Sequence, residues 1–201
     1  MEKTVIVDYG TSNLTSLLNA LEYINFPAVI TCDRKIINNA DKIIIPGVGA
    51  FDHAMENLNK FHLTEVIVNK VGKDTPVLGI CLGMHVLLSV GCENKKQQGL
   101  DIIEGEVVRI TGHKKVPHTG WNTITKIKDS PLLRDVSEEE YFYFVHSYIV
   151  KPYSIADIAA LTDYGTKFCS VINKNNVFGV QFHPEKSHNS GLKILSNFMK
   201  I

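Results

Sequence analysis

Short runs of apolar, mostly β-branched residues alternate with segments of helical spacing through the first half of the chain. Each run is too short for a buried helix, and polar residues do not alternate within it. Such strands are typical of a parallel sheet that helices cover on both faces. The sequence therefore predicts an α/β fold with a mostly parallel central sheet. The predicted strands are residues 4–7, 28–31, 42–45 and 77–80, and the predicted helices are residues 14–24, 51–59, 63–70 and 84–90.

The second half favours strands joined by short turns, so we expect an antiparallel β extension of the same core. Helical spacing returns only near the end of the sequence, at residues 192–199. No repeat and no Pro/Gly/Ser-rich linker divides the sequence, and residues 1–201 are expected to form a single domain. The predicted strands of this half are residues 106–110, 122–127, 141–150, 158–162, 168–173 and 177–182.

Composition excludes several classes of function. Lys and Arg number 21, as do Asp and Glu, whereas nucleic-acid and anionic-membrane binders usually carry a basic surplus. No apolar run is long enough to span a bilayer, and the N-terminus has no signal-peptide pattern, so a cytoplasmic location is expected. The eight histidines lack metal-ligand spacing, and no metal is expected. The cysteines show no disulfide framework; they are Cys32, Cys81, Cys92 and Cys169.

Cys81 is flanked by glycines in the segment Gly79-Ile80-Cys81-Leu82-Gly83, between a predicted strand and a predicted helix. A nucleophile on such a sharp turn needs glycines beside it because the backbone is crowded there. The turn would project the sulfur beyond the sheet and near a helix N-terminus, which favours the thiolate. It would also leave the Leu82 N–H free to stabilise an oxyanion. A structural cysteine in a tight turn is the alternative, and this pentapeptide does not decide between the two.

A thiol nucleophile needs a base, and His183 follows a predicted strand. In α/β sheets, functional groups gather beyond the carboxyl ends of the strands, so His183 is expected to reach Cys81. Glu185 lies two positions further on and would hold the imidazole in one tautomer. The three residues would form a Cys-His-Glu triad of nucleophile, general base and orienting group. The alternative is a strand-end turn whose polar side chains are solvated.

The strand at 42–45 runs into Gly47-Val48-Gly49 and then into a predicted helix. Backbone N–H groups of Gly47, Val48 or Gly49 would lie at the same edge of the sheet as Cys81 and could complete an oxyanion hole. A dinucleotide site is not indicated, because the third glycine of its fingerprint is replaced by Asp52. No cofactor is expected.

These elements, in this order, resemble the class I (triad) glutamine amidotransferases, which have a flavodoxin-like α/β fold. Motifs in the second half narrow the resemblance to the glutaminase subunits of imidazole glycerol phosphate synthases, and the resemblance covers essentially the whole chain. The segments that carry it are residues 8–13, 46–51, 79–84, 116–122, 143–148 and 181–187.

The resemblance implies a specific reaction. Cys81 would attack the side-chain amide of L-glutamine and expel ammonia, leaving a γ-glutamyl thioester that water hydrolyses to glutamate. His183 would transfer the proton, and Glu185 would orient His183. Ammonia would pass to a (β/α)8-barrel cyclase subunit in a heterodimer, which forms imidazole glycerol phosphate and aminoimidazole carboxamide ribotide in histidine biosynthesis. Glutaminase activity is expected to be weak without that partner.

The resemblance also assigns residues around the triad. Positions that bind the substrate are His85, Glu93, Ser147 and Tyr148. Positions expected at the partner interface are Pro117, His118, Trp121 and Asn122. The chain departs from the family at His85, where glutamine is usual, and at Thr119, where methionine is usual. The first departure puts the affinity for substrate in doubt.

Three alternatives remain open at this point. A paralogous glutaminase would feed ammonia to a different synthase. A stand-alone cysteine hydrolase of the same fold would turn over well without a partner and show no preference for glutamine. A non-catalytic binding module would carry a vestigial triad, which the intact Cys81, His183 and Glu185 argue against.

Overall fold

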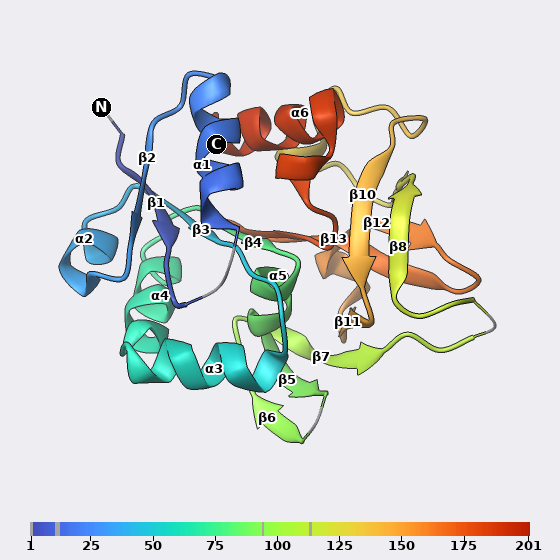
Figure 1. Ribbon diagram of the computed structural model, residues 1–201, viewed down its shortest axis with the longest axis horizontal. Coiled ribbons are helices and arrows are strands. Elements are labelled where there is room, and N and C mark those ends of the chain that lie inside the picture. The colour runs from blue at the N-terminus through green and yellow to red at the C-terminus, as the bar shows by residue number, and fades with distance from the viewer. Residues whose placement is uncertain (1, 11–12, 94, 113) are drawn as a thin grey trace.

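The computed structural model describes residues 2–10, 13–93, 95–112 and 114–201 (Figure 1). The core is a mixed sheet whose first part is parallel, with strand order β2-β1-β3-β4-β14. These strands are β1 (Thr4–Val7), β2 (Ala28–Thr31), β3 (Lys42–Ile45), β4 (Val77–Ile80) and β14 (Val177–Val180). The predicted α/β fold with a mostly parallel central sheet is confirmed.

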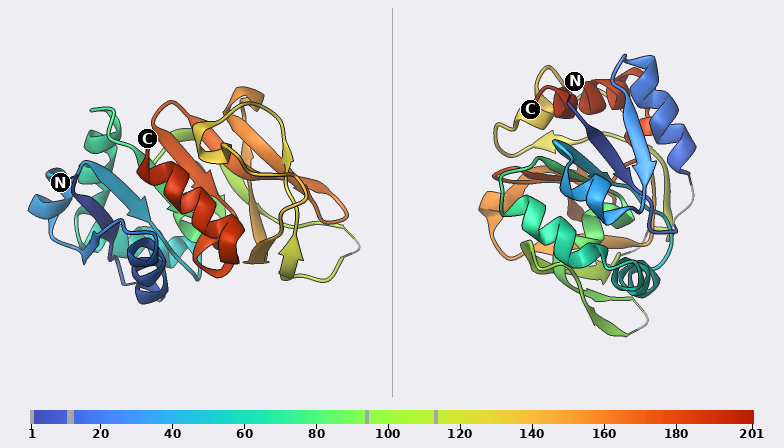
Figure 2. Two further views of the ribbon diagram at one scale, coloured as in Figure 1. Left: turned by 90° about the horizontal axis from the view of Figure 1, so that it is seen from above. Right: turned by 90° about the vertical axis from the view of Figure 1, so that its left-hand side faces the viewer.

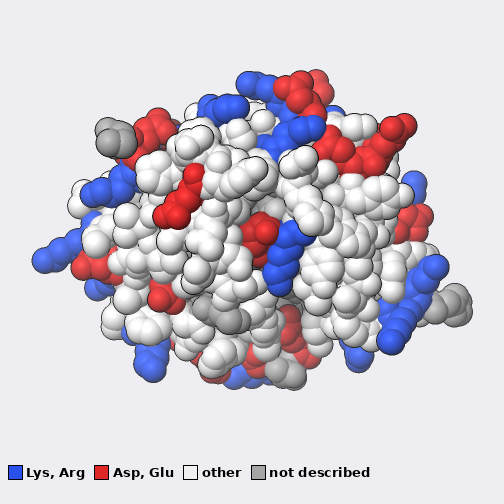
Figure 3. All heavy atoms as spheres, turned by 45° about the horizontal axis from the view of Figure 1, so that its top comes forward, with Lys and Arg blue, Asp and Glu red and all other residues white. Residues whose placement is uncertain are grey.

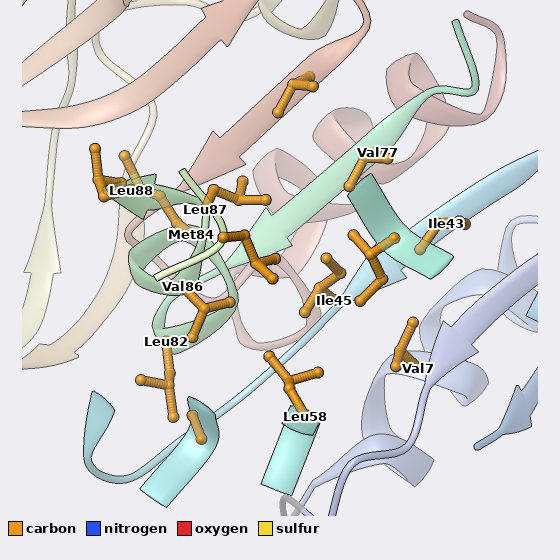
Figure 4. Close-up of a cluster of buried hydrophobic side chains, with 14 of the residues drawn as sticks. Val7, Ile43, Ile45, Leu58, Val77, Leu82, Met84, Val86, Leu87 and Leu88 are labelled. Atoms are coloured by element: carbon orange, nitrogen blue, oxygen red, sulfur yellow. The ribbon is translucent and has the colours of Figure 1, made fainter. Parts of the chain in front are cut away.

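The central parallel strands β1, β3, β4 and β14 are buried along their whole length because both faces of the sheet are covered there, whereas the edge strand β2 is only partly buried. Along β1, Val5 and Val7 belong to one hydrophobic cluster, whereas Ile6 belongs to a second cluster on the other face. Strand side chains alternate between faces, so β1, β3, β4 and β14 each contribute to both clusters. Figure 4 shows part of the first cluster, with Val7 and Ile45 from the strands and Leu58 from a helix.

Helices form the outer layers of this sandwich. Helices α1 (Leu14–Tyr23) and α6 (His188–Met199) cover one face, and their buried leucines and Phe198 join the second cluster. The first cluster is closed by α2 (Arg34–Asn38), α3 (Phe51–Lys60), α4 (Leu63–Val71) and α5 (Leu82–Val86). Figures 1 and 2 place α1 and α6 on one side of the sheet and α3 and α4 on the other.

Beyond β14 the sheet becomes mainly antiparallel, in the order β14-β13-β11-β7-β5-β6. Its strands are β5 (Leu88–Cys92), β6 (Lys96–Gln98), β7 (Ile103–Arg109), β11 (Tyr148–Pro152) and β13 (Lys167–Lys174). Strands β9 (Thr125–Lys126) and β12 (Ile158–Asp163) branch from β13. A separate antiparallel ribbon pairs β8 (His118–Asn122) with β10 (Phe142–His146). Short 3₁₀ turns lie at Pro131–Leu133, Ile155–Asp157 and Pro184–Lys186.

Several predicted boundaries are wrong. The helix predicted at 84–90 is the short α5, which gives way to β5 because its apolar run continues into the sheet. The strand predicted at 141–150 is two strands, β10 and β11, which belong to different sheets and are separated at Ser147. The strand predicted at 122–127 is likewise divided between β8 and β9. Helix α2 and strand β6 were not predicted.

Charged side chains are mixed over the surface. On the face in Figure 3, Lys and Arg are interspersed with Asp and Glu, in line with a formal net charge of zero. Within the described part of the chain, no helix combines the length and the apolar character needed to cross a membrane.

Candidate active site

Cys81 occupies the turn between β4 and α5 in a conformation that few side chains adopt. Its φ of 53° and ψ of −109° lie in a sparsely populated region, which costs about 1–3 kcal/mol in backbone strain. The turn is also tightly packed: a Cβ atom added at Gly83 would lie 1.6 Å from the carbonyl oxygen of Ile45. Glycine at position 83 therefore permits the close approach of α5 to β3 that this turn requires.

A cavity of about 300 Å³ opens at Cys81. Nine of the residues assigned to the site from the sequence line it: Val48, Gly49, Cys81, Leu82, His85, Glu93, Pro117, Ser147 and Tyr148. The sequence interpretation missed Ala50, Val145 and His146, which also line it. All three lie in segments that carry the family resemblance, 46–51 and 143–148, and that was the available signal.

His183 and Glu185 are brought to this site by the pairing of β14 with β4. Val180 and Ile80 are register partners in these parallel strands, so the residues after both strands emerge at the same edge of the sheet. Nδ1 of His183 lies 2.8 Å from Oε1 of Glu185, and their side chains are only 2% and 5% exposed. Nε2 of His183 is buried without a hydrogen-bond partner among the described residues, which leaves it available for proton transfer.

The surroundings of His183 favour its protonated form. Burial by itself lowers the pKa of His183, but the side chains of Cys81 and Glu185 outweigh burial and raise the pKa from 6.5 to about 10. The imidazolium is thus stabilised between a sulfur and a carboxylate. This is the charge arrangement expected of a thiolate–imidazolium pair.

Gln181 also contacts the sulfur, and the sequence interpretation gave it no role. Its Nε2 lies 3.7 Å from Sγ of Cys81, and its Oε1 lies 2.9 Å from Nε2 of His85. His85 is therefore connected to Cys81 through a buried amide. Burial lowers the pKa of His85 to about 4, although the hydrogen bond with Gln181 acts in the opposite direction.

The predicted oxyanion donors are close to Cys81, but one of them is already engaged. The N–H of Leu82 donates to the carbonyl oxygen of Gly47 at 3.3 Å. The preceding carbonyl, of Pro46, accepts a hydrogen bond of 2.7 Å from the buried Tyr9 hydroxyl. In this arrangement the Leu82 N–H cannot serve an oxyanion until the Gly47 carbonyl turns away.

Glu93 lines the cavity and at the same time caps a helix. Its Oε2 accepts from the N–H of Phe51, the first residue of α3, at 3.0 Å. Burial raises the pKa of Glu93, while the hydrogen bond from Phe51 lowers it and the charge of Asp52 raises it. The carboxylate is therefore fixed at the cavity wall by a helix N-terminus.

His118 and His146 connect the segment at 117–122 to the cavity wall. Nδ1 of His146 donates to the carbonyl oxygen of Tyr148 at 2.9 Å, so Nε2 of His146 is the acceptor for Nδ1–H of His118 at 3.0 Å. Burial is the main cause that lowers the pKa of His118 to about 4 and that of His146 to about 3. Both rings are neutral at physiological pH.

The four residues expected at the partner interface differ in exposure. His118 is buried between the rings of Phe144 and Tyr164, so it does not present a surface. Trp121 is 45% exposed and stacks on His188, with ring centroids 5.1 Å apart. Pro117 lines the cavity, and Asn122 bonds to the carbonyl of Asp163. Among the described residues, no cluster of three or more His, Cys, Asp or Glu is arranged to hold a metal ion.

An α/β fold with a cysteine nucleophile candidate at a strand-to-helix turn and a paired His and Glu nearby is typical of triad amidotransferases. Comparison with known proteins leads to the same class. A family model described as glutamine amidotransferase class-I matches residues 5–201. The chain belongs to the class I glutamine amidotransferases.

Individual relatives narrow the likeness. The chain is 47% identical over 198 residues to imidazole glycerol phosphate synthase subunit HisH of Chlorobaculum tepidum, covering 98% of each chain. It is 44% identical to the HisH subunit of Lactococcus lactis, covering 100% of this chain and 99% of that one. Among solved structures, PurLQS from Thermotoga maritima shares the fold with a TM-score of 0.76 at 14% identity, covering 99% and 98% of the two chains. A glutamine amidotransferase from the same organism has a TM-score of 0.68 at 13% identity, covering 99% and 83%.

Proposed function

We propose that this chain is the glutaminase subunit of an imidazole glycerol phosphate synthase. The proposal rests on Cys81 in the wall of a small cavity, with the paired His183 and Glu185 following the neighbouring strand at the same edge of the sheet. The chain is also 41–47% identical to HisH subunits over nearly its whole length. Residues 1–201 act as one glutaminase domain in this proposal. The cytoplasmic location expected from the sequence remains part of it.

Each side chain has a defined task. Sγ of Cys81 attacks the carboxamide carbon of glutamine, and the carbonyl π electrons move to oxygen, forming a tetrahedral intermediate. The His183 imidazolium then donates its proton as the C–N bond breaks, so ammonia leaves and a thioester remains. Neutral His183 next removes a proton from water, which attacks the thioester carbon. Collapse of the second intermediate releases glutamate and the sulfur.

The oxyanion of both intermediates needs hydrogen-bond donors. Rotation of the peptide unit between Gly47 and Val48 would remove the carbonyl from Leu82 and turn the Val48 N–H toward the substrate. Two backbone donors would then face the oxyanion, and the loss of one such donor typically costs about 100- to 1000-fold in rate. We propose that docking of the partner subunit causes this rotation.

The cavity suits the rest of a glutamine molecule. A volume of about 300 Å³ is at the lower end for ligand sites, as a small amino acid requires. In this proposal Glu93 binds the substrate ammonium group through Oε1, since Oε2 accepts from Phe51, and Ser147 and Tyr148 supply polar groups in the same cavity. At position 85 the family usually has a glutamine side chain; here His85 stands at that position and lines the same cavity.

The partner in this proposal is a (β/α)8-barrel cyclase subunit, which receives the ammonia. Trp121 marks the expected docking surface, because a large exposed aromatic ring beside Tyr143 and His188 is typical of an interface anchor. Pro117 lines the cavity and precedes Trp121 by four residues, so docking at Trp121 is connected through the chain to the cavity wall.

The experiment is to measure glutamate and imidazole glycerol phosphate formation with and without the barrel subunit. We expect glutamate release to be slow alone and strongly increased in the complex, with imidazole glycerol phosphate formed from glutamine. Cys81→Ser should bind the barrel subunit but release no glutamate. Partner-stimulated glutamate release without imidazole glycerol phosphate would favour a different synthase. Rapid partner-free turnover of substrates other than glutamine would favour a stand-alone hydrolase.

A further inference from the structure

A buried side-chain amide joins two residues of the cavity that lie on the same short helix turn. Gln181 is fully buried just after β14, and it bridges Sγ of Cys81 and Nε2 of His85. His85 itself is 4% exposed and follows Cys81 by one helical turn. The Gln181 amide therefore links the end of β14 to both Cys81 and helix α5.

The chemistry of the amide restricts the protonation of both neighbours. An amide group donates only through nitrogen and accepts only through oxygen. With nitrogen toward Cys81, the sulfur is the acceptor, which favours the thiolate form. With oxygen toward His85, Nε2 of the imidazole must carry the proton. The opposite amide orientation would require a thiol proton on Cys81 and an unprotonated Nε2, so the sulfur and the imidazole are linked through one rotatable group.

We propose, on the basis of the glutaminase function proposed above, that Gln181 is a positioning residue that holds Cys81 in its thiolate form, and that His85 fixes the orientation of the Gln181 amide. This gives the unusual His85 a task in activating the nucleophile besides any contact with substrate. Burial keeps His85 neutral above a pH of about 4, so its donor persists over the working pH range.

Two further ionisable groups, His183 and Tyr9, interact with the sulfur of Cys81. His183 is protonated and supports the thiolate from another side. Tyr9 is fully buried, and burial together with the charge of Cys81 raises its pKa far above neutrality, so it stays uncharged.

The test measures the rate at which iodoacetamide alkylates Cys81 in the full chain as a function of pH, followed by mass spectrometry of the Cys81 peptide. The exposed Cys32 and Cys92 report on general thiol reactivity in the same sample. Gln181→Met keeps the length of the side chain but cannot donate a hydrogen bond. We expect the midpoint of the Cys81 profile to move up by about one pH unit, a tenfold loss of rate below the midpoint.

Further variants separate positioning from folding. His85→Leu should move the midpoint in the same direction by a smaller amount, because the amide loses its fixed orientation. His85→Gln, which retains an N–H donor, should restore the wild-type midpoint. Gln98→Leu, on the distant β6, should leave it unchanged. If Gln181→Met does not fold, Gln181→Glu is the substitute, because it keeps a polar side chain. Its carboxylate is expected to move the midpoint of the Cys81 profile up further.

An unchanged midpoint in folded Gln181→Met, or in folded Gln181→Glu should the Met variant not fold, overturns the inference. Equal shifts in His85→Leu and His85→Gln would also contradict the task assigned to His85. Alkylation needs no glutamine, so this test is independent of the glutaminase proposal. If that proposal fails, the wild-type complex releases no glutamate, whereas the alkylation shifts are still observed.

Discussion

The N–H of Leu82 donates to the carbonyl oxygen of Gly47 at 3.3 Å, directly beside the sulfur of Cys81. This contact engages a donor that the proposed mechanism assigns to the oxyanion, while the cavity proposed for the substrate is already formed. We therefore expect partner docking to affect the chemical step without a matching effect on glutamine binding.

Partner docking should consequently raise kcat far more than it changes KM. A donor that acts only on the oxyanion stabilises the transition state and not bound glutamine. We expect kcat for glutamate release to rise by about 100- to 1000-fold in the complex, with KM changed by less than about threefold. Steady-state kinetics of the isolated chain and the complex measure both. A stimulation that appears mainly in KM would contradict the engaged-donor explanation.

Glu185→Gln should move the alkaline limb of the kcat/KM profile toward neutral pH. In the wild type, Cys81 and Glu185 raise the pKa of His183 to about 10. In the proposed mechanism, this imidazolium protonates the leaving nitrogen as the C–N bond breaks. Removal of the carboxylate charge lowers that pKa, so the proton is lost at lower pH. We expect a displacement of about one unit or more, whereas Glu56→Gln, at an exposed ion pair, should cause none.

The same substitution changes how stability depends on pH. A folded-state pKa above the unfolded value stabilises the native state fully below a pH of about 6.5, and this contribution disappears as the pH rises toward 10. Denaturant unfolding should therefore show a smaller loss of unfolding free energy between pH 6.5 and 10 for Glu185→Gln than for the wild type. An identical loss in both proteins would contradict the assignment of the charge pair.

Gly83→Ala should destabilise the chain severely. The added Cβ would meet the carbonyl oxygen of Ile45 at 1.6 Å, and a backbone atom cannot rotate aside as a side chain can. We expect a loss of more than about 4 kcal/mol of unfolding free energy, or failure to fold. Gly72→Ala is the matched control, since its Cβ would find its nearest neighbours at 3.7 Å and its φ is −66°. Comparable losses in both variants would be inconsistent with close packing at the turn.

Trp121→Ala should weaken binding of the barrel subunit while leaving the isolated chain folded. An exposed aromatic anchor at an interface is typically worth about 2 kcal/mol or more, which is about a 30-fold increase in Kd. Tyr23→Ala removes a more exposed aromatic ring at the end of α1, which runs back to the amino edge of the sheet. Titration calorimetry should show the large change only for Trp121→Ala. Equal Kd values for both variants would remove residue 121 from the interface.

Three strands of the parallel part were predictable because they are fully buried. The runs at 4–7, 42–45 and 77–80 have no polar alternation, and the sheet contains each of them with those bounds. The boundary between α5 and β5 was not predictable, because an apolar run such as Met84–Leu88 has no period that separates helix from strand. The break at Ser147 likewise carries no glycine or proline signal, and only the division of β10 and β11 between two sheets reveals it.

The site was predictable only as far as its residues follow strand ends. Cys81 and His183 follow the carboxyl ends of β4 and β14, as expected, but the parallel pairing of these strands was not predicted, because the strand at 177–182 was assigned to the antiparallel half. The bridge from Gln181 to His85 joins residues 96 positions apart, and neither residue type signals such a pair. The hydrogen bond that engages Leu82 depends on the orientation of one peptide unit, which a sequence does not record.

Covalent labelling tests most directly whether Cys81 is the nucleophile of a glutaminase. A glutamine analogue carrying a diazoketone should add its mass to the peptide containing Cys81, and glutamate release by the complex should fall in proportion to the label. Label on Cys32, Cys92 or Cys169 in place of Cys81, or full glutamate release after Cys81 is labelled, would contradict the account.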